Sequence, residues 1–275
     1  MKTMYFILFK SLFVLGTLSR LSNGSVVAIP PPNGTFGVNI RTMKLTDTSR
    51  FDPFAPTPEN RSAMLSVFYP VAFSKSCNIQ LAEYMPPTTA AVEDQSYAGY
   101  GLPNGTFESL YLSLCHPSSS SYTTCADDFP LVIFSPGLGN SRLIYNAIAQ
   151  SVSSYGYTVV TVDHPYDADI VEYPDGTFVL AANISTGEQI ELSVETRVKD
   201  ISFILDQLSI PSTTNGVLPL SKKGFKTSRV AMFGHSLGGA ATASTMVNDS
   251  RIIGGINLEY VTVRSFLRNV VDPSS

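Results

Sequence analysis

The chain has 275 residues, of which 44% are hydrophobic and 15% are charged. This balance is typical of a folded protein with a large buried core, and it excludes a disordered chain. A net charge of −4 without a basic cluster along the sequence argues against a nucleic-acid-binding protein.

The first 25 residues have the pattern of a secretory signal peptide. Lys2 gives a positive start, and the mostly apolar run from Tyr5 to Leu18 is too short for an ordinary membrane span. The alternative is an uncleaved signal anchor. Six N-x-S/T sequons also favour a secreted glycoprotein, and their asparagines are Asn23, Asn33, Asn60, Asn104, Asn183 and Asn248. We therefore expect a signal peptide over 1–25, an extracellular location and a single domain over 26–275.

Cysteine usage fits the same compartment. The three cysteines are Cys77, Cys115 and Cys125, and in an oxidising environment two of them pair. Closeness in sequence favours the pair Cys115–Cys125, although the connectivity stays open. No spacing resembles a zinc site, so we expect no metal and no cofactor.

The N-terminal part of the domain, residues 26–130, is predicted to be rich in loops because it contains many prolines. Two segments in it have strand patterns. Residues 36–40 alternate between apolar and polar side chains, and residues 64–69 are rich in β-forming types. Residues 88–128 are predicted to be an ordered but irregular insertion.

The catalytic core, residues 131–259, has a different pattern. Apolar runs and amphipathic segments alternate, with a hairpin at 170–180. The predicted strands are 131–134, 158–162, 229–233 and 252–258, and the predicted helices are 141–155, 194–208 and one from Ala240. This alternation predicts an α/β fold, a mostly parallel sheet with helices on both faces.

The motif Gly234-His235-Ser236-Leu237-Gly238 directly follows one of these strands and precedes a helix. The motif alone is a modest signal, but its context is that of a nucleophile turn, in which the serine hydroxyl projects from a strained backbone. Glycines at Gly234 and Gly238 allow close backbone approach. Ser236 is therefore the predicted nucleophile. The alternative is a glycine-rich helix start without catalysis.

Acyl transfer also needs two backbone donors for the developing oxyanion. The N–H of Leu237, next to the nucleophile, is one candidate. The second is the N–H of Leu138, because the loop Ser135–Gly139 follows an earlier strand of the predicted sheet. The alternative for this loop is an ordinary Pro-Gly turn.

The acid and the base are harder to assign. In this fold the nucleophile is followed by Asp or Glu and then by His. Glu259 ends the strand after the nucleophile helix and is the best candidate acid, whereas Asp249 and Asp272 are less well placed. No histidine follows Ser236; the three histidines are His116, His164 and His235. His164 is more typical of a loop-packing residue. The sequence therefore does not identify the base.

With these motifs in hand, the chain resembles the platelet-activating-factor acetylhydrolase family, in particular its secreted fungal branch. The resemblance extends from Phe36 to Glu259. It is carried by Ser66–Pro70, Phe134–Gly139, Ser141–Arg142, Val162–Asp167 and Gly234–Gly239. It implies the α/β-hydrolase fold and metal-free hydrolysis of short acyl esters, such as the sn-2 acetyl group of an ether phospholipid.

The resemblance also assigns roles. It implies Ser236 as nucleophile and Leu138 and Leu237 as oxyanion donors, and the acid of the family falls on Glu259. Residues 260–275 do not match the family, which would continue with a glycine-containing loop, two strands and the catalytic histidine. We therefore expect a C-terminally truncated or mis-spliced relative that lacks these last strands.

The leading hypothesis is a secreted serine esterase similar to 1-alkyl-2-acetylglycerophosphocholine esterase, with a small acyl ester or phospholipid as substrate. One alternative is a general carboxylesterase or polyester hydrolase. Another is a non-catalytic binding protein that keeps the scaffold. Adsorption to a lipid surface and the oligomeric state stay open.

Overall fold

The computed structural model describes residues 26–71, 77–117, 125–215, 218 and 223–259. The predicted signal peptide (1–25) and the predicted non-family tail (260–275) lie outside these described residues.

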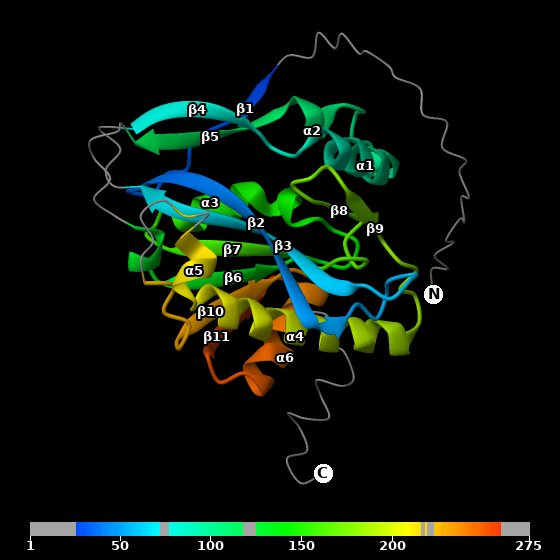
Figure 1. Ribbon diagram of the computed structural model, residues 1–275. Coiled ribbons are helices and arrows are strands. Elements are labelled where there is room, and N and C mark those ends of the chain that lie inside the picture. The colour runs from blue at the N-terminus through cyan, green and yellow to red at the C-terminus, as the bar shows by residue number, and fades with distance from the viewer. Residues whose placement is uncertain (1–25, 72–76, 118–124, 216–217, 219–222, 260–275) are drawn as a thin grey trace.

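A six-stranded sheet forms the centre of the molecule, with the order β11-β10-β6-β7-β3-β2 (Figure 1). The four strands β11, β10, β6 and β7 are parallel, and β3 is antiparallel to both β7 and β2. Their bounds are β2 Gly37–Phe51, β3 Asn60–Val71, β6 Leu131–Ser135, β7 Thr158–Asp163, β10 Val230–Gly234 and β11 Ile252–Asn257. The parallel part agrees with the predicted α/β fold.

Helices cover both faces of this sheet (Figure 1). Because side chains alternate along a strand, Ile133 packs in the same cluster as Leu205 of α4 (Gly187–Leu208), on one face. Its neighbour Phe134 packs in a second cluster with Ala149 of α3 (Asn146–Ser153). Helix α6 (Leu237–Asn248) contacts α4 and therefore lies on the α4 face.

Helix α4 begins at Gly187, seven residues before the start of the helix predicted over 194–208. Thr186 and Gln189 form a reciprocal capping box that satisfies free N–H groups at the helix start. Of the apolar positions in the predicted helix over 194–208, Val194, Ile201, Leu205 and Leu208 are buried, and Val198 is partly exposed. The predicted helix over 141–155 is divided into the 3₁₀ turn η4 (Arg142–Tyr145) and α3.

The segment 26–130 holds more regular structure than the sequence predicts. A second, three-stranded sheet has the order β1-β5-β4, and Figure 1 shows it above α3. Its strands are β1 Val27–Ile29, β4 Cys77–Glu83 and β5 Leu110–Pro117, and the helices beside it are α1 Pro87–Tyr97, η2 Ala98–Tyr100 and α2 Thr106–Ser109. The irregular insertion expected over 88–128 is therefore largely helix and strand. A proline at the first helical position, as in α1, is compatible with a helix start.

The disulfide differs from the pair that the sequence favours. Cys77 is bonded to Cys115, with 5.3 Å between the Cα atoms. The cause is the antiparallel pairing of β4 with β5, which places Ile79 opposite Cys115 and brings Cys77 close. Cys125 instead precedes the short helix η3 (Ala126–Asp128). The prediction of a Cys115–Cys125 pair was wrong because closeness in sequence does not reveal strand register.

The remaining elements are short. The predicted hairpin is present as β8 (Ile170–Glu172) and β9 (Phe178–Leu180), and α5 covers Pro211–Asn215. Of the helices in the described ranges, none has both the length and the apolar character needed to cross a bilayer.

Candidate active site

Ser236 occupies a sharp turn between β10 and α6. Its φ of 52° and ψ of −118° lie outside the regions that L-residues normally adopt, which is the strained geometry of a nucleophile turn. The two glycines are required by close contacts. A Cβ at Gly234 would lie 2.2 Å from the carbonyl oxygen of Gly238, and one at Gly238 would lie 2.0 Å from that of Ser135. The strand–turn–helix arrangement agrees with the sequence prediction.

The two predicted oxyanion donors lie in one neighbourhood. Leu138 packs on the hydrophobic cluster that contains Leu237 and Ala240. A Cβ placed on Gly137 would lie 3.5 Å from the Cβ of Ser236, so the loop runs beside the nucleophile. Within the described ranges, neither the Leu138 nor the Leu237 N–H has a hydrogen-bond acceptor in the protein. Both groups are thus available to an acyl oxygen.

Glu259 lies near the nucleophile turn, but it contacts a different imidazole from the one expected. Its Oε2 is 3.2 Å from Nε2 of His235, and the two side chains are 58% and 35% exposed. The other ring nitrogen of His235 lies 2.8 Å from the Tyr145 hydroxyl. In the part of the chain that the structure describes, no side chain is hydrogen-bonded to the Ser236 hydroxyl. Glu259 therefore orients no imidazole toward Ser236 there.

The two less well placed candidates for the catalytic acid, Asp249 and Asp272, do not lie beside Ser236 in the described residues. Asp249 accepts hydrogen bonds from Arg251 and Ser202, and these bonds outweigh burial and lower its pKa to about 2. It follows the far end of α6, away from Ser236. Asp272 lies outside the described residues.

Tyr145 joins the oxyanion loop to the nucleophile turn. Its hydroxyl accepts hydrogen bonds from the Gly137 N–H at 3.4 Å and from the Asn140 amide at 3.0 Å. Its own proton is therefore donated to Nδ1 of His235, which leaves the imidazole hydrogen on Nε2, facing Glu259. Sequence reasoning missed Tyr145, because nothing in the helical pattern around it marks a polar role.

His164 is buried and structural. Its Nδ1 lies 2.8 Å from Asp200 and its Nε2 lies 3.0 Å from the Ser135 hydroxyl. Burial lowers the pKa of His164, despite the hydrogen bond with Asp200 that raises it. The imidazole is therefore neutral near pH 7, and it packs under the loop as the sequence suggested. His116 lies in β5 of the second sheet.

Beneath the oxyanion loop lies a set of buried ionic residues that sequence reasoning also missed. Arg61 is paired with Asp52 and Asp200, and Arg142 and Arg197 have one aspartate each. All these side chains are at most 3% exposed. We call this set the charge cradle; its members are Asp52, Arg61, Arg142, Asp163, His164, Asp167, Arg197 and Asp200. Buried charges persist only when they are paired and hydrogen-bonded, as they are here.

One carboxyl group near the cradle is not balanced in this way. Glu93 of α1 is fully buried, and its Oε1 accepts a hydrogen bond from the Ser141 N–H. Its Oε2 has no partner among the described residues. Burial, reinforced by the nearby charge of Asp169, raises the pKa of Glu93 to about 8.

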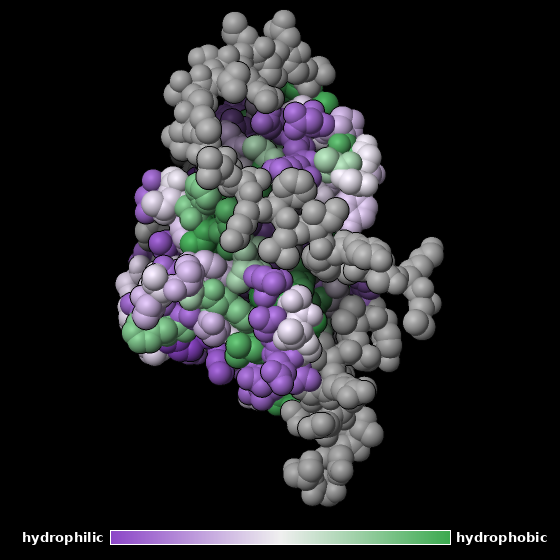
Figure 2. Space-filling view, turned by 90° about the vertical axis from the view of Figure 1, so that its right-hand side faces the viewer, coloured by the Kyte–Doolittle hydropathy of each residue, from purple (hydrophilic) through white to green (hydrophobic). Residues whose placement is uncertain are grey.

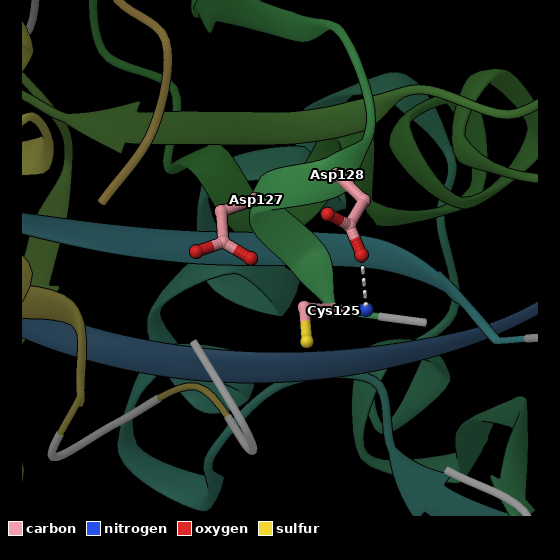
Figure 3. Close-up of side chains that lie close together, drawn as sticks. All are labelled: Cys125, Asp127 and Asp128. Atoms are coloured by element: carbon pink, nitrogen blue, oxygen red, sulfur yellow. Dashed lines mark hydrogen bonds between the residues drawn. The ribbon is translucent and has the colours of Figure 1, made fainter. Parts of the chain in front are cut away.

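A separate group of metal-ligand types, Cys125, Asp127 and Asp128, lies at the start of η3 (Figure 3). Their closeness follows from the local turn, since Asp128 Oδ2 accepts a hydrogen bond from the Cys125 N–H at 3.0 Å. Asp127 Oδ2 accepts one from the Lys223 N–H. The group is thus explained by helix capping and by a loop contact.

Known proteins are similar to this chain in sequence. The family model described as platelet-activating factor acetylhydrolase, isoform II, matches residues 26–261. A probable 1-alkyl-2-acetylglycerophosphocholine esterase of Arthroderma benhamiae is 33% identical over 240 residues, which cover 84% of this chain and 58% of the relative. A platelet-activating factor acetylhydrolase of Cavia porcellus is 29% identical over 256 residues, which cover 84% of this chain and 55% of the relative.

The fold also has a solved counterpart. A ferulic acid esterase from Streptomyces cinnamoneus superimposes with a TM-score of 0.62 and 28% identity, covering 83% of this chain and 60% of that chain. The chain spans somewhat more than half the length of the curated relatives it matches.

Proposed function

The chain belongs to the platelet-activating factor acetylhydrolase family, isoform II, and on that premise we propose that it is a secreted serine esterase. The proposed substrates are short acyl esters, with the acetyl ester of an ether phospholipid as the leading member, as the name of the Arthroderma benhamiae relative suggests. The strained backbone of Ser236 beside two unoccupied N–H groups carries the proposal.

In the proposed mechanism, the Ser236 oxygen attacks the ester carbonyl carbon and the alcohol leaves. The tetrahedral oxyanion accepts hydrogen bonds from the N–H groups of Leu138 and Leu237. Water then hydrolyses the acyl-enzyme and restores the serine. Because no described imidazole contacts the Ser236 hydroxyl, we expect this chain to be acylated slowly, at the residual rate that oxyanion stabilisation alone supports.

The test compares the chain with Ser236→Ala on p-nitrophenyl acetate, with intact mass spectrometry to detect an acetyl group on the protein. We expect slow release of p-nitrophenolate and an adduct at Ser236, both absent from the alanine variant. Equal rates and no adduct in either protein would reject the esterase proposal and favour a non-catalytic binding protein. A series of p-nitrophenyl esters of increasing acyl length separates a short-chain esterase from the general carboxylesterase alternative, which the ferulic acid esterase likeness favours.

We also propose that the protein is exported and glycosylated. The five sequon asparagines in the described ranges, Asn33, Asn60, Asn104, Asn183 and Asn248, are all exposed, and the Cys77–Cys115 disulfide suits an oxidising compartment. Expression in a fungal host should place the chain in the medium, with a mass that falls on treatment with peptide N-glycosidase. Retention in the cytosol at the unmodified mass would reject the proposed export and glycosylation.

Adsorption to a lipid surface is the last part of the proposal. Strands β8 and β9 follow β7 on the right-hand side of Figure 1, and Figure 2 shows green hydrophobic areas among hydrophilic ones on that side. Phe178 and Leu180 of β9 are 48% and 46% exposed. We expect Phe178→Ser with Leu180→Ser to weaken co-sedimentation with phosphatidylcholine vesicles, whereas Ile253→Ser on β11 should not. Equal binding by all three proteins would contradict a role for this hairpin.

A further inference from the structure

Arg197 of α4 reaches under the end of β6 and contacts the oxyanion loop directly. Its side chain is buried, and Nη1 donates hydrogen bonds to the Pro136 carbonyl oxygen at 2.5 Å and to the Ser135 hydroxyl at 3.3 Å. Nη2 donates to the Gly137 carbonyl oxygen at 3.3 Å. One guanidinium therefore holds three consecutive residues of the loop.

These contacts set the direction of the N–H groups in the loop. A trans peptide is planar, so the carbonyl of Gly137 and the N–H of Leu138 point in opposite directions. When Arg197 fixes the oxygen, it fixes where the Leu138 N–H points. The preceding peptide is held at both ends, because Arg197 binds the Pro136 oxygen and Tyr145 accepts from the Gly137 N–H.

Asp167 binds Arg197 through its side chain and binds Gly139, the residue after Leu138, through its backbone. Its carboxylate accepts from Nε of Arg197 at 2.9 Å and also from Nη2. Its backbone oxygen accepts from the Gly139 N–H at 2.9 Å, and Asp169 donates back to the Gly139 oxygen at 3.2 Å. Burial alone would raise the pKa of Asp167, but the charge and hydrogen bonds of Arg197 outweigh burial and lower it. Asp167 is therefore ionised at neutral pH and anchors the arginine.

We infer that Arg197, anchored by Asp167, is a positioning residue that aims the Leu138 N–H at the acyl oxygen during the reaction. The inference rests on the proposed esterase function for its role in catalysis. Fixed donors stabilise an oxyanion without reorganising during the reaction, which is where such a clamp acts. The geometry of the loop then has a cause outside the loop itself, in α4 and in the segment after β7.

The first experiment does not depend on activity. In the full chain labelled with ¹⁵N-leucine, the Leu138 amide signal is assigned by its loss in Leu138→Met. In Arg197→Met we expect this signal to shift and broaden, and in Arg197→Lys to return part of the way. Arg251→Met is the control, because Arg251 also forms ion pairs with aspartate, namely Asp206 and Asp249, but lies away from the loop. An unchanged Leu138 signal in Arg197→Met would overturn the inference.

The second experiment measures the consequence for chemistry. The probe is a p-nitrophenyl alkylphosphonate. The Ser236 oxygen forms a bond to phosphorus, the bond to p-nitrophenolate breaks, and the serine proton passes to solvent. The phosphoryl oxygen then occupies the place of the oxyanion. In Arg197→Met we expect the limiting rate to fall about 100-fold, while the half-saturating probe concentration changes by less than about twofold. The ³¹P shift of the adduct should also change.

The outcomes separate the two claims. If the unmodified chain forms no more adduct than Ser236→Ala, the esterase proposal fails, and the leucine signals still decide whether Arg197 sets the loop. If the chain reacts and Arg197→Met matches Arg251→Met in rate and ³¹P shift, positioning fails and the esterase proposal stands. Should Arg197→Met not fold, its double variant with Asp167→Asn removes the unpaired carboxylate, and Arg197→Lys keeps the charge.

Discussion

The two sides of Ser236 are built differently. On the side of β6 and β7, the oxyanion loop rests on the charge cradle, whose ionic side chains are nearly completely buried. On the side of β11, the outermost strand of the sheet, Glu259 is mostly exposed and its ion-pair partner is the partly exposed His235. Exposed pairs of this kind contribute little to stability, whereas breaking a buried pair costs several kcal/mol.

The difference indicates a division of roles. The loop that carries the proposed oxyanion donor Leu138 is held by contacts with α4 and with the segment after β7. The half around Glu259 depends on the end of one strand, next to an apolar groove lined by side chains that include Ile148, Val152, Ile256 and Leu258. The candidate site therefore combines a loop held by buried ion pairs, where the proposed oxyanion donors lie, with an exposed side around Glu259.

The largest effect should come from breaking the cradle. Asp200 accepts hydrogen bonds from Arg50, Arg61 and His164. In Asp200→Asn, Asp52 is the one carboxylate still paired with the buried Arg61 among the described residues. We expect this substitution to lower the free energy of unfolding by about 3–5 kcal/mol in urea denaturation. Asp206→Asn on the same helix, where the aspartate is 63% exposed, should change it by less than about 0.5 kcal/mol. Equal effects would remove the contrast between buried and exposed charge.

Acid should weaken the part of the cradle that contains Asp167 and Asp200. The pKa values of Asp167 and Asp200 are lowered, because their arginine and hydrogen-bonding partners outweigh burial. The unfolded chain therefore binds protons first. This stability is complete above about pH 5, begins to be lost as the pH falls below about 4, and continues to fall toward the lowered pKa values of the folded chain. The lowered pKa of His164 adds a loss that starts near about pH 6.5.

Urea denaturation at a series of pH values measures this acid effect. We expect the loss between roughly pH 7 and 3 to be smaller in Asp200→Asn than in the unmodified chain, because the lowered pKa of Asp200 contributes to that loss. Equal losses in the two proteins would contradict the role given to Asp200.

Glu93 gives a smaller effect of opposite sign. The pKa of Glu93 in the folded chain is about 8, which is above its value in the unfolded chain. Between these two values the unfolded chain has lost the Glu93 proton and the folded chain still holds it. Glu93 therefore lowers the stability of the folded chain more and more as the pH rises toward about 8. Glu93→Gln keeps an acceptor for Ser141 and removes the cost. We expect a gain on the order of 2 kcal/mol at about pH 8 and almost none near pH 4. Urea denaturation at pH 4 and 8 measures this gain, and Glu83→Gln at an exposed position should show none.

The smallest effect should be that of Glu259→Gln on stability. Glu259 is mostly exposed and its partner His235 is partly exposed, so we expect a change of less than about 0.5 kcal/mol in the free energy of unfolding. A loss above about 1 kcal/mol would show that this side is held more firmly than its exposure indicates.

The parts of the fold with a local signal could be predicted from sequence. The runs at 131–134 and 158–162 are buried and apolar, and the strand, serine turn and helix around Ser236 follow one another directly. Strand β4 could not be found in this way, because most of its residues are exposed and give no alternation. The disulfide depends on the register of β4 against β5, which no local pattern encodes.

The same distinction between local patterns and long-range contacts applies to the candidate site. Leu138, Leu237 and Ser236 belong to short motifs, and the structure brings them together. The cradle could not be predicted, because Arg61 and Asp200 are 139 residues apart and Arg197 and Pro136 are 61 apart. The contact between Glu259 and His235 could not be predicted either. The order of residues in this fold indicates a histidine after Glu259, whereas the imidazole that lies near Glu259 in space precedes it in the sequence.

The long sequence separations in the cradle have a consequence for folding. Contacts between residues far apart require large loops to close first, and chains dominated by such contacts fold slowly. Until α4 docks, Arg197 cannot reach the carbonyl oxygens of Pro136 and Gly137. We therefore expect the sheet to form before the oxyanion loop becomes ordered, so that during refolding the Ser236 reactivity appears later than the secondary structure.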